Sequence, residues 1–288
     1  MSESAWGNLG ANVVAALPDC RVTSGRTQMP LESLHDRTAL AQILARDPGL
    51  HLYSLGDLDD DYWPRTSWFG DGAGEVVLQY AAPGLAVLLA FTERPERMRA
   101  LLGELMPYLP RRFYAHLSPG LADVFEADYR ADLHGEFQRM LLTDAAAPGT
   151  IDTSACEPVG SEQVDEARAF YAEAYPGNWF DPRMLSTNHY FGIRKSARLI
   201  ALAGVHLFSA RYGVAALGNV CVHPDYRGRN LGTVVTARTC QSLRPHARVI
   251  GLNVDRANRA AVRCYAKLGF TAATTFQEIM LTSRDPIS

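Results

Sequence analysis

The pattern of apolar and polar positions predicts one order of elements twice along the chain: two helices, three strands, a helix, a strand, a helix and a last strand. In the second half, helices are expected over residues 161–175, 231–243 and 258–268, a short helix from Asp181, and strands over 190–194, 198–208, 212–222 and 248–254. In the first half, helices are expected over residues 36–46, 95–109 and 121–129, and strands over 67–70, 75–82, 85–91 and 112–117.

A short sequence repeat supports this duplication. Residues 137–143 (FQRMLLT) and 276–282 (FQEIMLT) lie 139 positions apart, share four of seven residues, and both read as strands that end a half. Residues 143–154 lack periodicity and contain Pro148-Gly149, which is typical of a linker. We therefore predict two domains, residues 1–147 and 148–288.

Composition excludes several classes of protein. The apolar run 76–92 is too short for a membrane helix and is broken at Pro83-Gly84. A net charge of −3 argues against general nucleic-acid binding. The N-terminus lacks the basic region of a secretory signal, and the cysteines form no CxxC pair, so we expect reduced thiols, no metal site and a cytoplasmic location. The cysteines are Cys20, Cys156, Cys221, Cys240 and Cys264.

Positive charge is concentrated in one segment of this acidic chain. Residues 221–270 carry nine Arg and Lys against only Asp225 and Asp255. Such a segment indicates either a locally bound anionic ligand or arginines that are solvated on helix faces.

Within this segment an apolar strand ends at Pro224, a turn rich in Gly and Arg follows, and a helix begins near Leu231. Successive backbone N–H groups of such a turn and of a helix N-terminus can hold phosphate oxygens, and glycine permits a positive φ. Arg227 and Arg229 would add charge at the rim. The stretch matches neither a Walker loop nor a Rossmann glycine pattern, yet it predicts a pyrophosphate cradle.

The stretch resembles the pyrophosphate loop of the GNAT superfamily of acyl-CoA-dependent N-acetyltransferases, Arg/Gln-x-x-Gly-x-Gly/Ala. Residues 227–232 (RGRNLG) fit that frame except that Asn230 stands in place of the first glycine. Asn tolerates the left-handed conformation, so we expect the loop to keep its role with somewhat altered geometry. Asn253, Asn258, Ala261, Tyr265, Gly269 and Phe270 are similar to the family's second signature.

The resemblance implies an α/β (α+β type) fold with two tandem GNAT-like domains, each a mixed, mostly antiparallel sheet flanked by helices. It also implies roles for the matched residues. The backbone of Val220 and Val222 would pair with the pantetheine arm, and the N–H of Val222 would stabilise the oxyanion. Asn253 and Asn258 would contact the cofactor. The pyrophosphate would be held by Arg227, Gly228, Arg229, Asn230, Leu231 and Gly232.

Tyr265 would lie at the cofactor sulfur as general acid. Tyrosine ordinarily titrates near 10 and an alkyl thiol near 8.5, so full proton transfer to a thiolate is uphill by about 2 kcal/mol. We therefore describe Tyr265 as a hydrogen-bond donor that passes a proton on.

The implied reaction is direct transfer of an acetyl group from acetyl-CoA to a primary amine in a ternary complex. Many relatives carry a Glu on the fourth strand as general base, where this chain has Gly218 and Asn219. The alternatives are a chain of water molecules or one of four side chains: His189, His206, Glu173 and Asp181. The missing carboxylate also keeps open a non-catalytic acyl-CoA-binding module, and an enzyme using a longer acyl-CoA is a further alternative.

Each matched residue also has a simpler interpretation. Asn258 fits a helix N-cap alone, Tyr265 fits core packing, and Arg229 fits a solvated loop. Other residues near the motif are interpreted as structural: Cys221 and Cys264 as inert thiols, His223 as a strand-end residue, and residues 57–61 (DLDDD) as a solvated acidic turn rather than a calcium loop.

The first half lacks the loop motif. Its equivalent segment, residues 92–95 (TERP), has a Glu and no glycine, and Glu126 falls at the position equivalent to Tyr265. We therefore predict a degenerate GNAT-like domain. Its aromatic segment 53–69, with Tyr62, Trp63, Trp68 and Phe69, is expected either to shape an acceptor pocket between the domains or to pack in the core.

Overall fold

The computed structural model describes residues 31–82 and 84–284; Cys20, the N-terminal segment and Pro83 lie outside these residues. The helices are α1 (Arg37–Leu44), α2 (Leu52–Gly56), α3 (Pro95–Leu105), α4 (Val164–Ala174), α5 (Leu231–Leu243) and α6 (Arg259–Lys267). The strands are β1 (Glu32–Ser33), β2 (Thr66–Gly70), β3 (Val76–Ala82), β4 (Leu85–Ala90), β5 (Arg112–Leu117), β6 (Tyr129–Leu142), β7 (Glu157–Pro158), β8 (Phe191–Lys195), β9 (Arg198–Ser209), β10 (Val214–Val222), β11 (Val249–Asp255) and β12 (Phe270–Ser283).

All these strands belong to one sheet, in the order β1-β2-β3-β4-β5-β12-β6-β11-β10-β9-β8-β7. Read inward from the two edges, the sheet has the same succession of strands: β1 to β5 and then β12 from one edge, and β7 to β11 and then β6 from the other. Neighbours are antiparallel except for the pairs β4–β5 and β10–β11, which are parallel. The predicted duplication and the mixed, mostly antiparallel sheet flanked by helices are confirmed.

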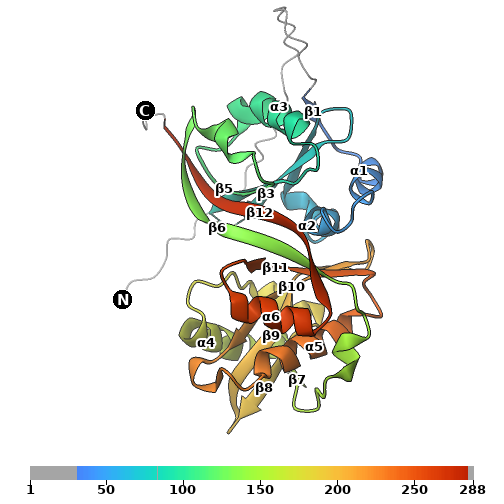
Figure 1. Cartoon of the computed structure of the whole chain (residues 1–288), viewed down its shortest axis with the longest axis vertical. Coiled ribbons are helices and arrows are strands. Elements are labelled where there is room, and N and C mark those ends of the chain that lie inside the picture. The colour runs from blue at the N-terminus through green and yellow to red at the C-terminus, as the bar shows by residue number, and fades with distance from the viewer. Residues whose placement is uncertain (1–30, 83, 285–288) are drawn as a thin grey trace, which may run out of the picture.

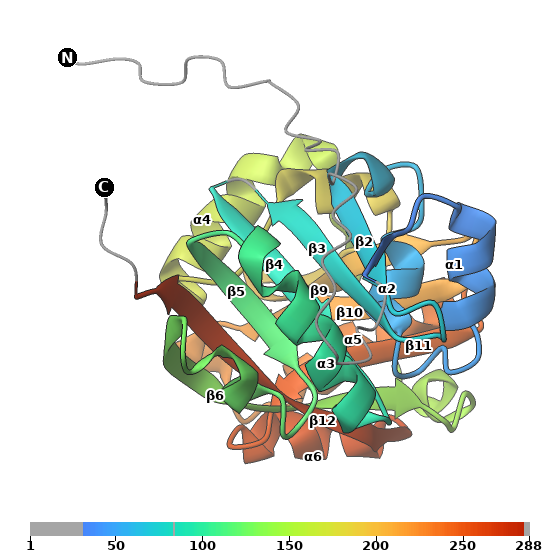
Figure 2. The ribbon, with the colours of Figure 1, turned by 90° about the horizontal axis from the view of Figure 1, so that it is seen from above.

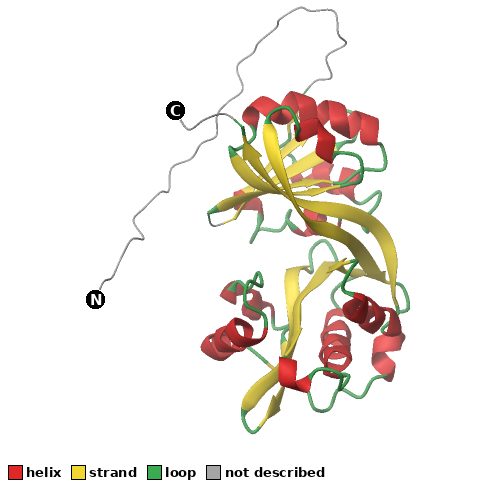
Figure 3. Cartoon of the chain, turned by 60° about the vertical axis from the view of Figure 1, so that its left-hand side comes forward, coloured by secondary structure: helices red, strands yellow, loops and turns green. Residues whose placement is uncertain are grey.

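The centre of the sheet is an exchange of the two final strands (Figure 1). β6, from the first half, pairs with β11 of the second, and β12, from the second half, pairs with β5 of the first. The two repeat segments lie side by side in antiparallel register, with Phe137 opposite Phe276. Two sheets predicted as separate are thus continuous, as the strands running from one lobe into the other show in Figure 3. The domain division at 147/148 stays a prediction.

Helices cover the two halves of the sheet separately. α3 lies across β3, β4 and β5 in Figure 2, and its Met98, Leu101 and Leu102 are buried in a core cluster with residues of these strands and of β12. α4, α5 and α6 contribute to the largest core cluster, together with β9, β10 and β11. α2 contacts the second half directly, because Gly56 lies against Leu207 of β9.

Most predicted elements are confirmed within a few residues. The Asp36 carboxylate accepts hydrogen bonds from the first turn of α1, and Gly269 takes a φ of 83° after α6. The helix predicted over residues 121–129 is wrong, since only the single 3-10 turn η3 (Ala122–Phe125) forms there. The chain must already be extended at Tyr129, which pairs with Ser283 of β12. Strand pairing therefore overrides the helical pattern.

The fully buried guanidinium of Arg139 lies at the junction of the halves, and no carboxylate of residues 31–82 or 84–284 forms an ion pair with it. Its Nε donates to Asn253 Oδ1 at 3.1 Å, and its Nη1 donates to the carbonyls of Gly49 and Leu50. Aromatic rings surround it, with the Phe91 centroid 4.4 Å from Cζ. Burial lowers its pKa to about 10, so Arg139 stays charged at neutral pH and joins β6, β11 and the turn before α2.

Replacing Arg139 with Ala should lower the free energy of unfolding by about 3 kcal/mol, because it leaves a cavity and two buried carbonyls without donors. Equilibrium denaturation in urea measures the change. Arg130→Ala, an exposed position on the same strand, is the matched control and should change stability by less than about 0.5 kcal/mol. Equal effects of the two substitutions would contradict the structural role of Arg139.

Candidate active site

The strand β10 is interrupted by a bulge at Asn219. Gly218 is opposite Gly204 and Cys221 is opposite Leu202, so β10 carries one extra residue, and Asn219 takes a left-handed φ of 55°. The buried side chain of Asn219 bonds to His206 at 3.1 Å and to the Tyr190 hydroxyl at 3.0 Å. The bulge is therefore held by side chains, and it redirects the end of β10.

Beyond the bulge, β10 and β11 separate. They pair only from Val214 to Leu217, although β10 continues to Val222 and β11 to Asp255. The N–H of His223 bonds to Ile200 of β9, so by strand alternation the backbone groups of Val222 and Val220 lie on the opposite edge. That edge faces away from β9, where an extended segment could be added. Its Val222 carbonyl accepts from Arg227 Nε at 3.2 Å, so an added segment would compete with that side chain.

The predicted loop connects β10 to α5 through two left-handed residues. A 3-10 turn, η7 (Pro224–Tyr226), follows β10, and then Gly228 takes a φ of 76° and Asn230 a φ of 61°. Asn230 thus has the conformation expected of the glycine that it replaces. Arg229 lies over the Tyr226 ring at 5.1 Å and donates to the Asp225 carbonyl, so it is fixed within the loop.

The start of α5 fits a pyrophosphate group. No side chain caps this 13-residue helix, and its first intrahelical donor is Val234, so the N–H groups of Leu231, Gly232 and Thr233 are free for an anion. A Cβ on Gly232 would meet only Val222 Cγ2, at 3.5 Å, so no protein atom requires glycine there. Among the described residues, Arg227 and Arg229 form no ion pair. The residues present therefore suit a phosphate ligand.

Tyr265 is the buried residue of α6 and lines the same cleft. Its hydroxyl bonds to none of the described residues, and burial raises its pKa well above the ordinary value. Tyr265 is thus a poor acid but an available hydrogen-bond donor, in line with the sequence argument. Asn258 caps α6 by accepting from Ala261 N at 3.1 Å, and Asn253 accepts from Arg139, so both amides have structural partners as well.

These groups open onto one cleft of about 2070 Å³ between the two halves. Its walls include β10, the 227–232 loop and α6 on one side and the face of β3, β4, β5 and β12 opposite to α3 on the other. Tyr53 and Tyr62 line the cleft, whereas Trp63, Trp68 and Phe69 pack into the core. The segment thus contributes Trp63, Trp68 and Phe69 to the core, and the acceptor role of Tyr53 and Tyr62 at the cleft stays a prediction.

Of the four proposed bases, two line the cleft. His206 is one, and burial lowers its pKa, so it is neutral at physiological pH. Asp181 is the other, and its carboxylate pairs with Arg183 at 2.9 Å. His189 instead bonds to Ser242 at 2.7 Å away from the cleft, and Glu173 bonds to His223.

The residues near the motif that were interpreted as structural behave accordingly. Burial raises the pKa of Cys221 to about 11 and also raises that of Cys264, so both thiols stay protonated. His223 is the N-cap of η7, where it accepts from Asp225 N. Its buried ring also bonds to Glu173 at 2.9 Å.

The prediction that residues 57–61 form a solvated turn is wrong in part. Asp59 bonds to Ser209, and Asp60 pairs with Arg37 and Arg211. Asp57, by contrast, is only 7% exposed, lines the cleft, and has its pKa raised to about 8 by burial. Sequence reasoning missed this carboxylate. The described residues contain no cluster of side chains suited to a metal ion.

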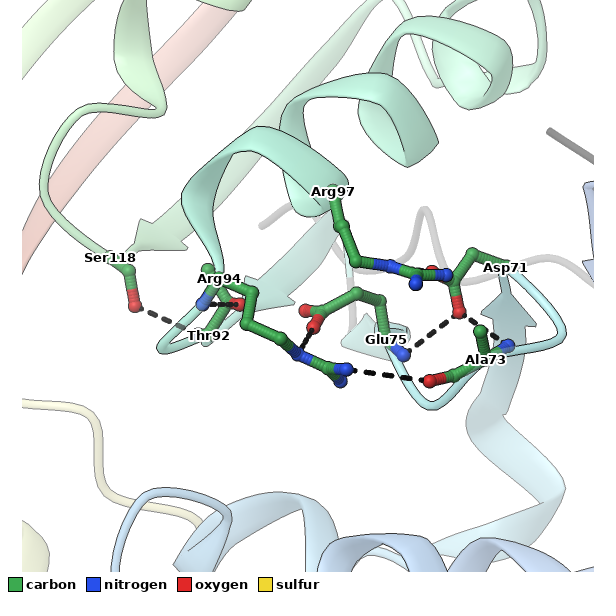
Figure 4. A network of polar contacts seen from close by, with 7 residues as sticks. All are labelled: Asp71, Ala73, Glu75, Thr92, Arg94, Arg97 and Ser118. Carbon is green, nitrogen blue, oxygen red and sulfur yellow. Dashed lines mark hydrogen bonds and ion pairs between the residues drawn. The ribbon is translucent and has the colours of Figure 1, made fainter. Parts of the chain in front are cut away.

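The corresponding region of the first half is built differently. β4 and β5 stay paired from Ala86 to Ala90, so no open edge exists there. Arg94, which precedes α3, pairs with the buried Glu75 at 2.7 Å, and Arg97 donates to the buried Asp71 (Figure 4). The arginines at the start of α3 are thus neutralised by carboxylates of the chain itself.

Asn230 offers a test of the loop geometry, because its side chain makes no capping bond. Asn230→Gly should raise the free energy of unfolding by up to about 1 kcal/mol, since glycine adopts a positive φ without strain. Asn230→Ala should lower it by about 1 kcal/mol. Thermal and urea denaturation measure both changes, and the same sign for both would contradict the left-handed conformation.

Comparisons with known proteins agree with this geometry. Residues 156–270 match the family model described as the acetyltransferase (GNAT) family. No curated protein matches the sequence significantly. No helix among the described residues is long and apolar enough to cross a membrane.

Solved structures share the fold over most of the chain at low identity. A Drosophila protein superposes with a TM-score of 0.66 at 14% identity, covering 88% of this chain and 98% of its own. A tandem GNAT protein from the clavulanic acid biosynthesis pathway has a TM-score of 0.55 at 16% identity, covering 90% and 100%. A GCN5-related N-acetyltransferase from Sphaerobacter thermophilus has a TM-score of 0.54 at 13%, covering 89% and 96%. Residues 156–270 are therefore similar to the acetyltransferase (GNAT) family, and the chain shares its fold with these structures over most of its length.

Proposed function

We propose that the protein is an N-acetyltransferase that transfers an acetyl group from acetyl-CoA to a primary amine. One observation carries the proposal. The open edge of β10, the uncapped start of α5 and the free hydroxyl of Tyr265 all face one cleft. These are the groups needed for an extended amide arm, a pyrophosphate and a thioester sulfur.

The cofactor is held mainly by the backbone. Val220 and Val222 pair with the amides of the pantetheine arm as an added strand would. The N–H groups of Leu231 to Thr233 bind the pyrophosphate, and Arg227 and Arg229 add positive charge at its rim. Asn253 and Asn258 lie beside the path, with their amide N–H groups available to the cofactor.

Transfer follows from proximity of the two substrates. The amine lone pair forms the C–N bond at the acetyl carbon as the C–S bond breaks, with Val222 N–H donating to the developing oxyanion. Tyr265 donates a hydrogen bond to the sulfur as thiolate character develops. Of the two protons lost by the ammonium group, one ends on the thiol and the other leaves through water or a cleft-lining base such as His206.

Two observations favour alternative functions for this cleft. The absence of a carboxylate on β10 favours a non-catalytic acyl-CoA-binding module, and a cleft of about 2070 Å³ favours a longer acyl group. Competition among acetyl-, propionyl- and benzoyl-CoA distinguishes the acyl groups.

We infer that the first half is a degenerate copy without an acyl-CoA site. Its strands stay paired, and Glu75 and Asp71 occupy the charged groups beside α3. We also propose a cytoplasmic location, which is supported by free thiols at the described cysteines.

Acetyl-CoA at about 100 times its dissociation constant should raise the free energy of unfolding by roughly 2.7 kcal/mol, which corresponds to a Tm increase of several degrees. Gly232→Glu should abolish the increase, because a carboxylate would meet the pyrophosphate. Gly103→Glu, an exposed position within α3 with open space at the Cβ, is the control and should keep it. A wild-type protein that folds but does not respond to any acyl-CoA would overturn the proposal.

Tyr265→Phe should lower kcat by about 10- to 1,000-fold while leaving the acetyl-CoA dissociation constant within threefold, because the hydroxyl acts on the sulfur during transfer. Steady-state release of CoA and equilibrium binding measure the two quantities. If the wild type is active and Tyr265→Phe turns over at the same rate, Tyr265 has no role in the mechanism. If neither protein releases CoA, the non-catalytic binding module is favoured.

A further inference from the structure

The cleft has two ends of opposite charge. Four Arg and Lys side chains line the cleft, and three of them belong to the 227–232 loop and α6: Arg227, Arg263 and Lys267. The end that faces the first half carries carboxylates from the turn after α2, the residue before η6 (Pro182–Thr187) and β12: Asp57, Asp61, Asp181 and Glu278. A fifth carboxylate, Asp255 at the end of β11, also lines the cleft and accepts from Ala257 N at 2.8 Å. The only described cation there is Arg183, which is neutralised by Asp181 at 2.9 Å. The loop end suits an anionic cofactor, whereas the other end suits a cation.

Asp57 is the buried carboxylate of that end whose side chain has no partner among the described residues; Asp61 has none there either, but it is exposed. It follows α2 and is 93% buried, and its side chain forms no hydrogen bond or ion pair with residues 31–82 or 84–284. Asp181 pairs with Arg183, and Glu278 accepts from the Tyr114 hydroxyl at 2.6 Å. A buried carboxylate without a partner is destabilising unless a ligand supplies the cation or proton, so Asp57 marks a ligand-binding position.

Aromatic rings complete the surroundings of Asp57. Tyr53 and Tyr62 line the cleft on either side of it in the sequence, and Tyr175 and Trp179 are half exposed on the opposite wall. An ammonium group is attracted to ring faces as well as to a carboxylate. A carboxylate of an acceptor, in contrast, would meet only like charges there, because the single arginine is already paired.

Asp57 shares an electrostatic neighbour, Tyr53, with Tyr265. Burial raises the pKa of Tyr53 to about 12, and Glu278 and Asp57 add to the rise. Burial also raises the pKa of Tyr265, and smaller contributions to this rise come from groups that include Cys264, Tyr175 and Tyr53. The phenol of Tyr53 thus interacts electrostatically with both Asp57 and Tyr265, and all three residues line one cleft.

We propose that Asp57, supplied by the N-terminal half, binds the ammonium group of the acceptor, and that the acceptor is a cationic amine without a carboxylate. The inference rests on the proposed function, since it names the substrate class of the same cleft. Asp57 acts as a specificity residue, and the degenerate half keeps a binding role after losing the features of a cofactor site.

The pH dependence of amine binding follows from the same group. Burial raises the pKa of Asp57 to about 8, so below pH 8 an ammonium ion must displace a proton from it. Affinity should rise up to tenfold per pH unit from pH 6 to 7.5 and level off above about 8. Tyr53 and Tyr62, with pKa values near 12, and His206, with a lowered pKa, stay neutral over this range. The other ionisable groups that line the cleft on that side include Asp61, Asp181, Arg183, Tyr80, His116, His134 and the Tyr114-bonded Glu278.

The experiment uses two matched probe pairs, tyramine with tyrosine and agmatine with arginine, which differ by one carboxylate. Their binding to the full chain saturated with CoA is measured by calorimetry at pH 6 to 8.5. We expect each amine to bind at least tenfold more tightly than its carboxylated partner. Asp57→Asn should weaken amine binding at least tenfold at pH 8 and remove the pH slope.

Asp60→Asn is the matched control, because Asp60 lies in the same acidic run but is exposed and pairs with Arg37 and Arg211. It should leave binding within threefold of the wild type. Asp57→Ser provides a second neutral variant, and melting temperatures verify that each protein is folded.

Equal binding of amines and amino acids, unchanged binding in Asp57→Asn, or no binding of either amine at 10 mM (roughly the limit for a specific site) would each overturn the inference. Acetyl-CoA binding is measured on the same samples. If it is intact, such a result overturns the acceptor assignment alone. If the wild type binds no acyl-CoA, the proposed function fails and the inference with it.

Discussion

The antiparallel pairing of β6 with β12 is the interaction on which the rest of the structure depends. Each is the final strand of its half and 14 residues long, and each completes the sheet of the other half. Phe137 and Phe276 meet at the centre with ring centroids 5.7 Å apart, and the buried Arg139 lies over Phe276 and Phe91. Because both halves share this centre, the cleft between them has fixed walls, and residues from either half can contribute to one site.

The two halves illustrate how one arrangement of strands can serve two purposes. In the second half, the bulge at Asn219 separates β10 from β11 and leaves backbone groups unpaired. In the first half, the equivalent strands remain paired, and internal ion pairs of Arg94 and Arg97 replace an external anion. The same fold therefore gives a cofactor-type opening on one side and a closed wall on the other. Function lies in these local departures rather than in the shared topology.

Much of this could be predicted from the sequence, because the informative residues act locally. The left-handed Asn230, the cap at Asn258 and the glycine after α6 are set by neighbours within a few positions. The strand exchange could not be derived in this way. The repeat marked both strands, but pairing partners far apart in the chain leave no trace in periodicity. The same pairing forces Tyr129 into a strand and ends the predicted helix at one turn.

The burial of Asp57 in the cleft could not be predicted from the sequence, for a related reason. An acidic run ordinarily indicates a solvated turn, and three of its members do contact solvent or surface partners. The available signal was its position four residues after Tyr53, which places both side chains on one face of a short helix. Without knowledge that α2 contacts the second half, that face could not be assigned to a cleft.

The exchange of final strands also has a consequence for synthesis on the ribosome. The first half emerges with the edge of β5 unpaired, and its own last strand, β6, has no partner until β11 and β12 follow. Residues 270–283 leave the exit tunnel after the other described strands, and among these strands they close the gap between β5 and β6. The first half therefore cannot complete its sheet during synthesis before β12 emerges. The sheets of both halves are completed together when β12 pairs with β5 and β6.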